Sequence, residues 1–319
     1  MDITITTFNV ENLFNRYAML DEPWEGRNYE QVVMAVGLVS VGDRQGALVS
    51  YETTHIQRNN TAMAILDAAP DILAVQEVEN IYTLRNFNSE YLDDYFDRIL
   101  LIDGNDPRGI DVGLLLRKGL KVEVADIRTH VDEPLDKKAV TRRAARDFGY
   151  MATGALFSRD CLEVDVRAGG ETLTLLVNHL KAQDGKANSV KRRKTQAARV
   201  EQLAKQAADA GKKPIVLGDL NVAPETDGSL EPLLKSKVLQ NVKPADACGE
   251  WTHFYRAKKE YARLDYILPH KSLNVVGTNI MRKGLTTIAK QYAGDRYPTI
   301  GPQHTEASDH CPVSAKIAV

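Results

Sequence analysis

A short apolar run that ends abruptly in polar residues, at positions 214–222, restricts the possible folds more than any other segment. Residues 215–217 are apolar and have the length of a buried strand, and Gly218 ends the run. Asp219 and Asn221 follow with one residue between them, and side chains two apart in an extended segment point to the same side. A carboxylate can orient water or bind a hard cation, and a carboxamide can donate to a phosphate oxygen. The segment also fits a strand followed by a polar turn, because Gly, Asp and Asn are turn residues.

The same pattern of apolar runs ending in polar side chains recurs along the chain. The polar residues at the other predicted strand ends are Asn9 and Glu11, Glu77, Asn178 and His179, Asp265, and Asp309 with His310. If these ends meet, they form a site with several carboxylates, two imidazoles and amides. Such a set suits Mg²⁺ or Mn²⁺ rather than zinc, and an imidazole beside a carboxylate is held in one tautomer. This chemistry is that of metal-assisted hydrolysis of a phosphate ester.

Strand-length runs and a few helical patterns fill most of the chain. The predicted strands cover residues 3–9, 71–77, 98–102, 110–116, 120–129, 150–157, 162–166, 172–180, 215–217, 263–268, 273–280 and 313–317. The predicted helices cover residues 51–68, 84–96 and 187–210. Residues 15–50 fit either a hairpin with its turn near 42–43 or a helix and a loop. With no linker, and with hairpin-like spacings, the pattern favours an α/β fold of two mixed, largely antiparallel sheets in a single domain over residues 1–319.

Composition and a few sequence patterns bear on the partners and the location of the protein. The 41 basic and 43 acidic residues nearly balance, so the net charge of −2 selects no partner. The three cysteines lie far apart, which excludes a disulfide framework and a cysteine zinc site. The N-terminus lacks the basic and apolar regions of a signal peptide, and no apolar run is long enough to cross a bilayer. We therefore expect a cytoplasmic protein with no membrane partner, although a mature secreted form would share these features.

Six short motifs give the chain a family resemblance. They lie at residues 8–14, 73–78, 177–181, 218–221, 263–266 and 308–312. In this order they resemble the motifs of the endonuclease/exonuclease/phosphatase superfamily, whose members share the DNase I-like fold, and together they span nearly the whole chain. The resemblance implies a four-layer sandwich of two mixed, largely antiparallel β-sheets flanked by helices. It also implies a phosphoesterase that depends on a divalent metal.

The resemblance assigns a metal site. Glu77 would be the main Mg²⁺ (or Mn²⁺) ligand, with Asn9, Glu11 and Asp309 nearby. The family often has Asp at the position of Glu11, so the role of Glu11 as a direct ligand depends on how its longer side chain is placed.

The resemblance also assigns catalytic roles. Asp219 would position or deprotonate the attacking water, and Asn221 would hold that water or a phosphate oxygen. His310, together with Asp309, would lie at the scissile phosphate, and Asp265 would orient the imidazole of His310. His179 would contact the phosphate or donate a proton to the leaving oxygen. Without the resemblance, a histidine at the position of His179 would more often be a core histidine, and Asp265 would be acceptable as an edge-strand acid.

Basic segments bear on the substrate. Residues 137–146 hold five basic side chains and residues 186–199 hold six, and neither segment contains an acid. Such cations can bind the phosphates beside a scissile bond, although basic runs are often only solvated faces. Arg159 lies where DNase I-like relatives carry a phosphate-contacting Arg, but the neighbouring prolines of that pattern are missing. The residues that we expect to bind substrate are Arg108, Asp111, Asn178, Lys181, Arg142, Arg143, Arg192 and Arg193.

Three functions are compatible with these residues. The first is a nuclease that acts on DNA or RNA, which the basic segments favour. The second is a phosphatase or phosphodiesterase for a lipid head group or another small phosphoester, which would use the same catalytic residues. The third is a catalytically inactive binding module, which the presence of all the expected acids and both histidines disfavours.

Overall fold

The structure is a computed structural model of the chain. It describes residues 1–15, 17–21, 35–41, 44–50, 53–106, 108–135, 154–244 and 248–319; for residues 17–21, 35–41 and 44–50 only the backbone is described. Of the described helices, none combines the length and apolar character needed to span a membrane.

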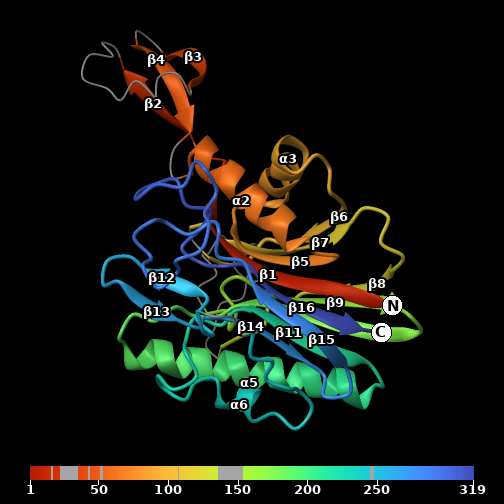
Figure 1. Cartoon of the computed structure of the whole chain (residues 1–319). Coiled ribbons are helices and arrows are strands. Elements are labelled where there is room, and N and C mark those ends of the chain that lie inside the picture. Colours follow the sequence, from red (N-terminus) through yellow and green to blue (C-terminus); the bar gives the residue numbers. More distant parts are fainter. Residues whose placement is uncertain are drawn as a thin grey trace.

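The first main sheet has six strands in the order β15-β16-β1-β5-β7-β6 (Figure 1). Its strands are β1 (Asp2–Leu13), β5 (Ile72–Val78), β6 (Phe96–Leu101), β7 (Asp111–Arg117), β15 (Asn274–Ile280) and β16 (Val313–Ala318). Only the pairing of β1 with β5 is parallel.

The second main sheet has five strands in the order β14-β11-β10-β9-β8. Its strands are β8 (Glu123–Arg128), β9 (Cys161–Ala168), β10 (Glu171–His179), β11 (Lys213–Asp219) and β14 (Asp265–Pro269). Here β10 and β11 are parallel, and the other pairs are antiparallel.

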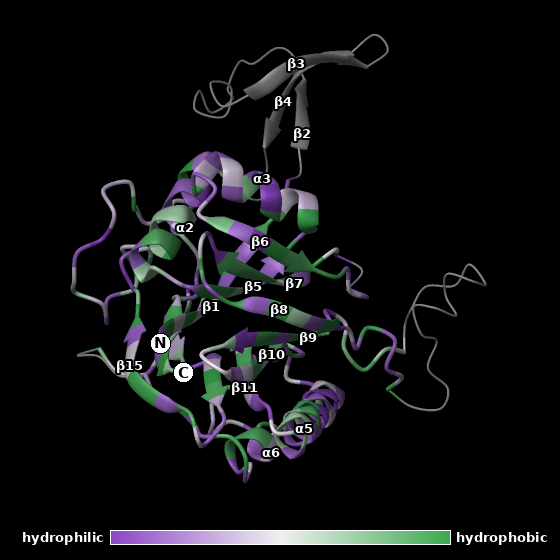
Figure 2. Ribbon diagram, turned by 90° about the vertical axis from the view of Figure 1, so that its right-hand side faces the viewer, coloured by the Kyte–Doolittle hydropathy of each residue, from purple (hydrophilic) through white to green (hydrophobic). Residues whose placement is uncertain are grey.

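Helices cover the outer faces of the two sheets. Figures 1 and 2 show α2 (His55–Ala68) and α3 (Ile81–Tyr91) over the first sheet, and α5 (Ala187–Asp209) and α6 (Glu231–Leu234) over the second. The result is the four-layer α/β sandwich that the resemblance implied.

Alternation along the strands explains why their sequences are almost continuously apolar. In β10, Leu175 and Val177 lie in the core between the two sheets, whereas Leu176 packs toward α5. In β11, Leu217 likewise faces the other sheet and Val216 faces α5. Strands covered on both faces bury side chains on both, so apolar residues predominate along β10 and β11.

Several sequence predictions of elements need correction. The helix predicted to reach residue 96 ends at Tyr91, and Phe96 already begins β6. The strand predicted at 150–157 lies partly outside the described residues, and its described part, 154–157, forms only an isolated bridge between Ala155 and Pro134. Residues 253–262, for which no element was predicted, form the hairpin of β12 (His253–Tyr255) and β13 (Glu260–Ala262).

The described parts of residues 15–50 follow the hairpin alternative. The strands β2 (Tyr17–Asp21), β3 (Ala35–Val41) and β4 (Arg44–Ser50) form an antiparallel sheet in the order β2-β4-β3. Val41 pairs with Arg44, so the β3–β4 connection falls at the expected residues 42–43.

Candidate active site

Three polar side chains lie in one row across the second sheet. His179 is the register partner of Asp219, and Asp219 is the register partner of Asp265. Each lies two residues from an apolar side chain in the core between the sheets, so each points to the same side as that core. Asn9 continues the inward-facing positions of β1 and meets this row from the first sheet. The row therefore lies between the two sheets, at one end of the sandwich.

Irregular strand ends place further side chains at this end. Glu77 has a φ of 65°, and the register of β5 against β7 shifts between Gln76 and Val78. Glu11 has a φ of 47°, and the register of β1 against β5 shifts between Asn9 and Leu13. Bulges of this kind redirect a side chain out of strict alternation, and they are frequent next to active sites.

The carboxylate of Asp219 lies at the centre of the cluster. Its Oδ2 accepts hydrogen bonds from Asn9 Nδ2 and Asn221 Nδ2, both at 3.1 Å, and its Oδ1 accepts from the backbone N–H of Asn221 at 2.8 Å. Its Oδ2 also lies 3.4 Å from His179 Nε2 and 3.8 Å from His310 Nε2. Burial raises the pKa of Asp219 to about 6, because removing water penalises the charged form. Asp219 is thus a buried base whose pKa lies close to neutral pH.

The imidazole of His310 is held by Asp265. Its Nδ1 donates to Asp265 Oδ2 at 2.8 Å, and the same oxygen accepts from Thr252 Oγ1 at 2.6 Å. Burial opposes a charge on His310, but the carboxylates of Asp265 and Asp219 outweigh it and hold the pKa of the imidazole well above its usual value. The ring therefore presents Nε2–H toward Asp219.

His179 differs from His310 in its charge. Burial, together with the charges of Arg159 and His310, holds the pKa of His179 well below its usual value, so the ring is neutral. Its Nε2 lies 3.8 Å from Glu77 Oε1 as well as near Asp219, and its buried Nδ1 has no hydrogen-bond partner in the described part of the chain. One cationic and one neutral imidazole thus flank the same carboxylate.

Asp309 joins the loop before β16 to β1 and to the β12–β13 hairpin. Its backbone N–H donates to Glu11 Oε2 at 2.9 Å, and its Oδ2 lies 3.3 Å from His253 Nε2. The ring of His253 in turn packs 4.6 Å from the ring of His310. Burial raises the pKa of Asp309, but the hydrogen bond from His253 and the charge of His310 outweigh it, so the carboxyl is ionised.

Comparison with known proteins identifies the family of the chain. The model of the Endonuclease/Exonuclease/phosphatase family matches residues 7–310. The chain belongs to this family. Family membership supports a hydrolase of phosphoesters, and the solved relatives are of the DNase I-like superfamily. No curated protein matches the chain in sequence.

Solved structures of the superfamily share the fold at low sequence identity. A truncated TDP2 from Caenorhabditis elegans is 14% identical with a TM-score of 0.60, over 100% of this chain and 98% of that one. An endonuclease/exonuclease/phosphatase from Bacteroides vulgatus is 16% identical with a TM-score of 0.60, over 100% and 99%. The human Nocturnin catalytic domain, solved with a bound sulfate anion, is 16% identical with a TM-score of 0.58, over 99% and 94%. At such identities the likeness supports the fold alone.

Enzymes of this superfamily generally use divalent metals, and the acidic side chains here fit such an ion. Burial and the neighbouring carboxylate of Asp309 raise the pKa of both Glu11 and Glu77. Among the described residues, no Lys or Arg forms an ion pair with either glutamate. Buried carboxylates that repel one another need a countercharge, and oxygen donors are the ligands of hard cations. Glu11, Glu77 and Asp309 would hold a Mg²⁺ or Mn²⁺ ion at this site.

Two different groups of ligating atoms among the described residues do lie within a few ångströms of one another. They are His253, Asp309 and His310, and Asp219, Asp265 and His310; within each group the atoms lie within 4.8 Å of one another. Both require His310, which Asp265 already holds through Nδ1. Glu11 and Glu77 keep raised pKa values and form no ion pair with a described Lys or Arg, so they are the better candidates for a hard cation. Asn9, predicted as a ligand, uses Nδ2 on Asp219 and accepts from Glu11 N–H through Oδ1, so it links the two groups of acids.

Some of the predicted substrate-binding residues are committed to the protein instead. Arg193 is buried, and its guanidinium binds Ser229 Oγ, Lys181 O and Asp227. Asn178 is also buried, and its Nδ2 donates to the carbonyl of Leu176. Neither side chain faces a substrate in this arrangement, because the helical and strand periods turn both inward.

The other predicted substrate contacts fall into separate places. Asp111 Oδ1 accepts from Gly104 N–H at 2.6 Å and fixes the loop beside β7. Arg108 pairs with Asp106 and keeps much of its side chain exposed. Lys181 and Arg192 line a pocket at the start of α5. Arg142 and Arg143 lie outside the described residues.

His253 is the functional candidate that sequence reasoning missed. It belongs to a three-residue strand, which is too short to show a hydrophobic period. The only sequence signal for His253 is its position in residues 251–255, shortly before the 263–266 motif.

Arg159 was assigned to phosphate binding by the resemblance, although the neighbouring prolines of that pattern are missing. In the structure its side chain is buried. Its Nε lies 3.1 Å from Asp106 Oδ2, and its Nη1 donates to Leu180 O at 3.2 Å.

Proposed function

We propose that the protein is a divalent-metal-dependent phosphodiesterase that cleaves nucleic acid by attack of water on the scissile phosphate. This proposal rests mainly on the groups that surround the Asp219 carboxylate. Two amides fix its oxygens, two imidazoles of different charge flank it, and its pKa of about 6 makes it an effective proton acceptor near neutral pH.

The residues divide the work as follows. Asp219 accepts the proton of the attacking water, while Asn9 and Asn221 keep the carboxylate in one orientation. His310 donates from Nε2 to a phosphoryl oxygen, and Asp265 keeps its ring in place. Neutral His179 donates a hydrogen bond to the phosphate from the neighbouring strand. Fixed donors of this kind stabilise the charge that develops on the phosphate.

A bound divalent cation supplies positive charge that polarises a phosphoryl oxygen. Glu11, Glu77 and Asp309 would hold this cation, while Asp265 and Thr252 serve the imidazole of His310. The acids of the site are thus divided between a metal-binding group and a group that serves water and imidazole.

Two observations support nucleic acid as the substrate. Lys181 lies two residues beyond His179 and lines a pocket together with Lys191 and Arg192. These cations can bind phosphates next to the scissile one. A structural relative of the same fold, TDP2 from D. rerio, was solved in complex with a single-strand DNA product; it is 14% identical with a TM-score of 0.58.

The test compares the purified protein with its Asp219→Asn variant. Each is incubated with Mg²⁺ and supercoiled DNA, single-stranded DNA, RNA, or bis(p-nitrophenyl) phosphate. We expect turnover of at least one nucleic acid, and a loss of about 10²-fold or more in the variant, the usual scale for removing a general base. The matched control is Asp209→Asn, which makes the same change at an exposed position on α5.

The outcomes separate the candidate functions. Cleavage of bis(p-nitrophenyl) phosphate without cleavage of any polymer would favour the small-phosphoester alternative. Inactivity on every phosphoester would overturn the proposal and favour a binding module. Full activity of Asp219→Asn would remove Asp219 from the chemistry.

A further inference from the structure

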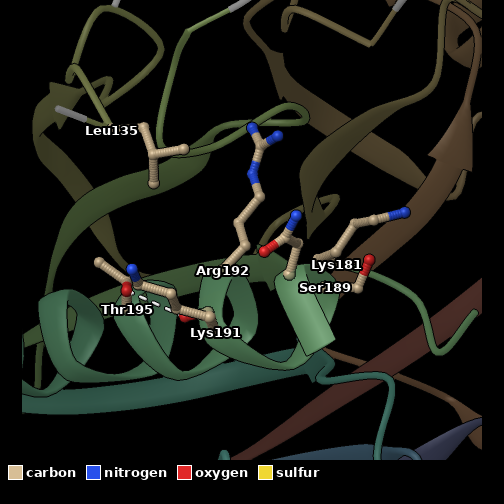
Figure 3. Close-up of a pocket in the computed structure, with 7 residues that line it drawn as sticks. Leu135, Lys181, Ser189, Lys191, Arg192 and Thr195 are labelled. Atoms are coloured by element: carbon tan, nitrogen blue, oxygen red, sulfur yellow. Dashed lines mark hydrogen bonds between the residues drawn. The ribbon is translucent and has the colours of Figure 1, made fainter. Parts of the chain in front are cut away.

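A pocket of about 450 Å³ opens between the segment after His179 and the first turns of α5. Figure 3 shows Lys181 on one side of it, Lys191 on the helix, and Arg192 rising from the helix toward the loop that carries Leu135. Its polar lining also includes Asn188, and no acidic residue is among the lining residues described. All the charged residues in the described wall are therefore basic.

Arg192 is the most constrained of the three cations. Its Nη2 donates to the carbonyl of Ala155 at 2.5 Å and its Nε to that of Leu156 at 3.3 Å. These carbonyls orient the guanidinium but carry no net charge. Among the residues that the structure describes, no carboxylate forms an ion pair with Arg192 or Lys191, and Lys181 has only Asp184 at 3.7 Å. Burial and the charge of Arg159 lower the pKa of Arg192 more than the carboxylate of Asp106 raises it, so the pocket favours an additional anion.

The pocket adjoins the catalytic cluster through a shared backbone. The carbonyl of Leu180 accepts from Asn221 Nδ2 at 3.1 Å and from Arg159 Nη1 at 3.2 Å. Lys181 follows directly, and its N–H is fixed by Gln196 of α5 at 2.9 Å. Two residues of extended chain span at most about 7 Å, so Lys181 lies within about that distance of His179 along the backbone.

We propose that this pocket is a second phosphate subsite, which binds the phosphate adjacent to the scissile one in the same substrate. The proposal rests on the proposed phosphodiesterase function and makes it more specific. The enzyme would select substrates with at least two phosphate groups over esters with one. Arg192 suits this role because its planar fork can donate to two oxygens of a phosphate, whereas Lys191 and Lys181 act as point charges.

The test measures what an extra phosphate contributes. Dinucleotides are compared with no terminal phosphate, with a 5′-phosphate and with a 3′-phosphate, by KM for hydrolysis. Binding to the Asp219→Asn variant is measured in parallel by calorimetry. We expect one terminal phosphate to improve KM and affinity about tenfold, the scale of a charge-assisted contact. This gain should fall below about twofold in Lys191→Glu and in Arg192→Gln, each also built on Asp219→Asn for the binding arm.

The control is Lys205→Glu, which reverses an exposed charge on the same helix outside the pocket lining and should retain the tenfold gain. Lys191 is exposed, so its substitution tests the pocket without disturbing the core. The proposal is overturned if neither terminal phosphate improves binding, or if the gain persists in both pocket variants. Because the binding arm needs no turnover, absence of hydrolysis would overturn the phosphodiesterase function while leaving the subsite separately measured.

Discussion

Left-handed backbone at single residues shapes the site. Glu11, Glu77 and Asn221 have φ values of 47°, 65° and 60°, in the region that non-glycine residues seldom adopt. Holding such a residue costs about 1–3 kcal/mol, so the surrounding contacts must impose it. In each case the residue lies at or just beyond a strand that enters the cluster, and the unusual backbone turns its side chain toward the other acids.

The first prediction for a single residue concerns His253. Its Nε2 lies 3.3 Å from Asp309 Oδ2, so we expect it to position that carboxylate for a metal ion. Such partners typically contribute 10–100-fold to metal affinity. His253→Phe keeps the ring contact with His310 but loses the donor, and it should weaken Mn²⁺ binding about tenfold in calorimetry.

His253→Gln separates this role from simple packing. The amide retains a donor, so this variant should keep more of the Mn²⁺ affinity than His253→Phe. Equal affinity in wild type and His253→Phe would show that Asp309 needs no such partner, and a larger loss in His253→Gln than in His253→Phe would assign the effect to the ring contact instead of the donor.

Individual residues were predictable where alternation or a motif fixed their direction. Asp219 and Asp265 continue the inward-facing positions of their strands, so the direction of their side chains followed from the pattern, whereas their meeting with His179 and His310 followed from the resemblance. The directions of the side chains in the basic run 191–194 could not be predicted in the same way. Four consecutive cations look alike in sequence, but the helical period turns only Arg193 inward, onto Ser229 and Asp227.

At the scale of elements, the parallel pair β10–β11 depends on a glycine. Gly218 has a φ of 133°, and a Cβ at this position would lie 1.9 Å from the carbonyl oxygen of Asn178, its register partner. Gly218→Ala should therefore lower the free energy of unfolding by about 2 kcal/mol or more, measured by urea denaturation. Gly277→Ala is the control, because its Cβ would meet nothing within 4 Å and its φ is not left-handed; it should change stability by less than about 1 kcal/mol. Similar stabilities for the two variants would contradict the close approach of the strands.

A histidine joins the end of β8 to β9 and, through Glu133, to α5. His130 donates from Nδ1 to Glu133 at 2.6 Å and from Nε2 to Glu163 at 2.9 Å. Arg199 of α5 also binds Glu133, and Arg128 binds Glu163. Burial lowers the pKa of His130, but the two glutamates outweigh it and raise the pKa to about 9.

The pH dependence of stability follows from this pKa. A folded pKa above the unfolded value of about 6.5 means that the contribution of His130 is complete below pH 6.5 and is lost as the pH rises through about 9. His130→Gln keeps hydrogen-bonding groups without the titrating charge. The stability difference between wild type and this variant, from urea unfolding at pH 6 to 10, should decline over that window. A difference that is constant with pH would show that folding does not raise the pKa of His130.

Elements were predictable where they were long. The 23-residue α5 and the central strands carry clear periodic patterns. The β12–β13 hairpin has strands of three residues, and α6 has four, so neither contains a full period from which to infer its type. The early end of α3 has a local cause, since Asn88 uses its side chain to hold Phe96 by both backbone groups, which starts β6.

At the scale of the whole molecule, the site exists only because the two sheets meet. Asn9 and Asp219 are 210 residues apart in sequence, and Ser308 Oγ donates to the carbonyl of Asn9 across 299 residues. No local pattern encodes such contacts. The strand ends could be recognised in the sequence, but their meeting at one end followed only from the family resemblance.

The last prediction concerns the acidic side chains that meet where the two sheets come together. Glu11 on β1, Glu77 on β5 and Asp309 before β16 would share one cation, so metal binding should stabilise the fold as a whole. A ligand that binds only the folded state contributes about 2.7 kcal/mol at 100 times its Kd. We expect Mg²⁺ or Mn²⁺ to raise the melting temperature of the chelated protein by a few degrees, and excess EDTA to reverse the shift.

Glu77→Gln tests whether the shift arises at this site. The amide is a poorer ligand than a carboxylate, so the metal-induced shift in melting temperature should shrink or vanish. The variant also relieves the repulsion between Glu77 and Asp309, so its melting temperature without metal should be equal to or above that of the chelated wild type. Glu90→Gln, an exposed change on α3, should show the full shift. An undiminished shift in Glu77→Gln would place the cation elsewhere, and the absence of any shift in the wild type would argue against a metal at the junction of the sheets.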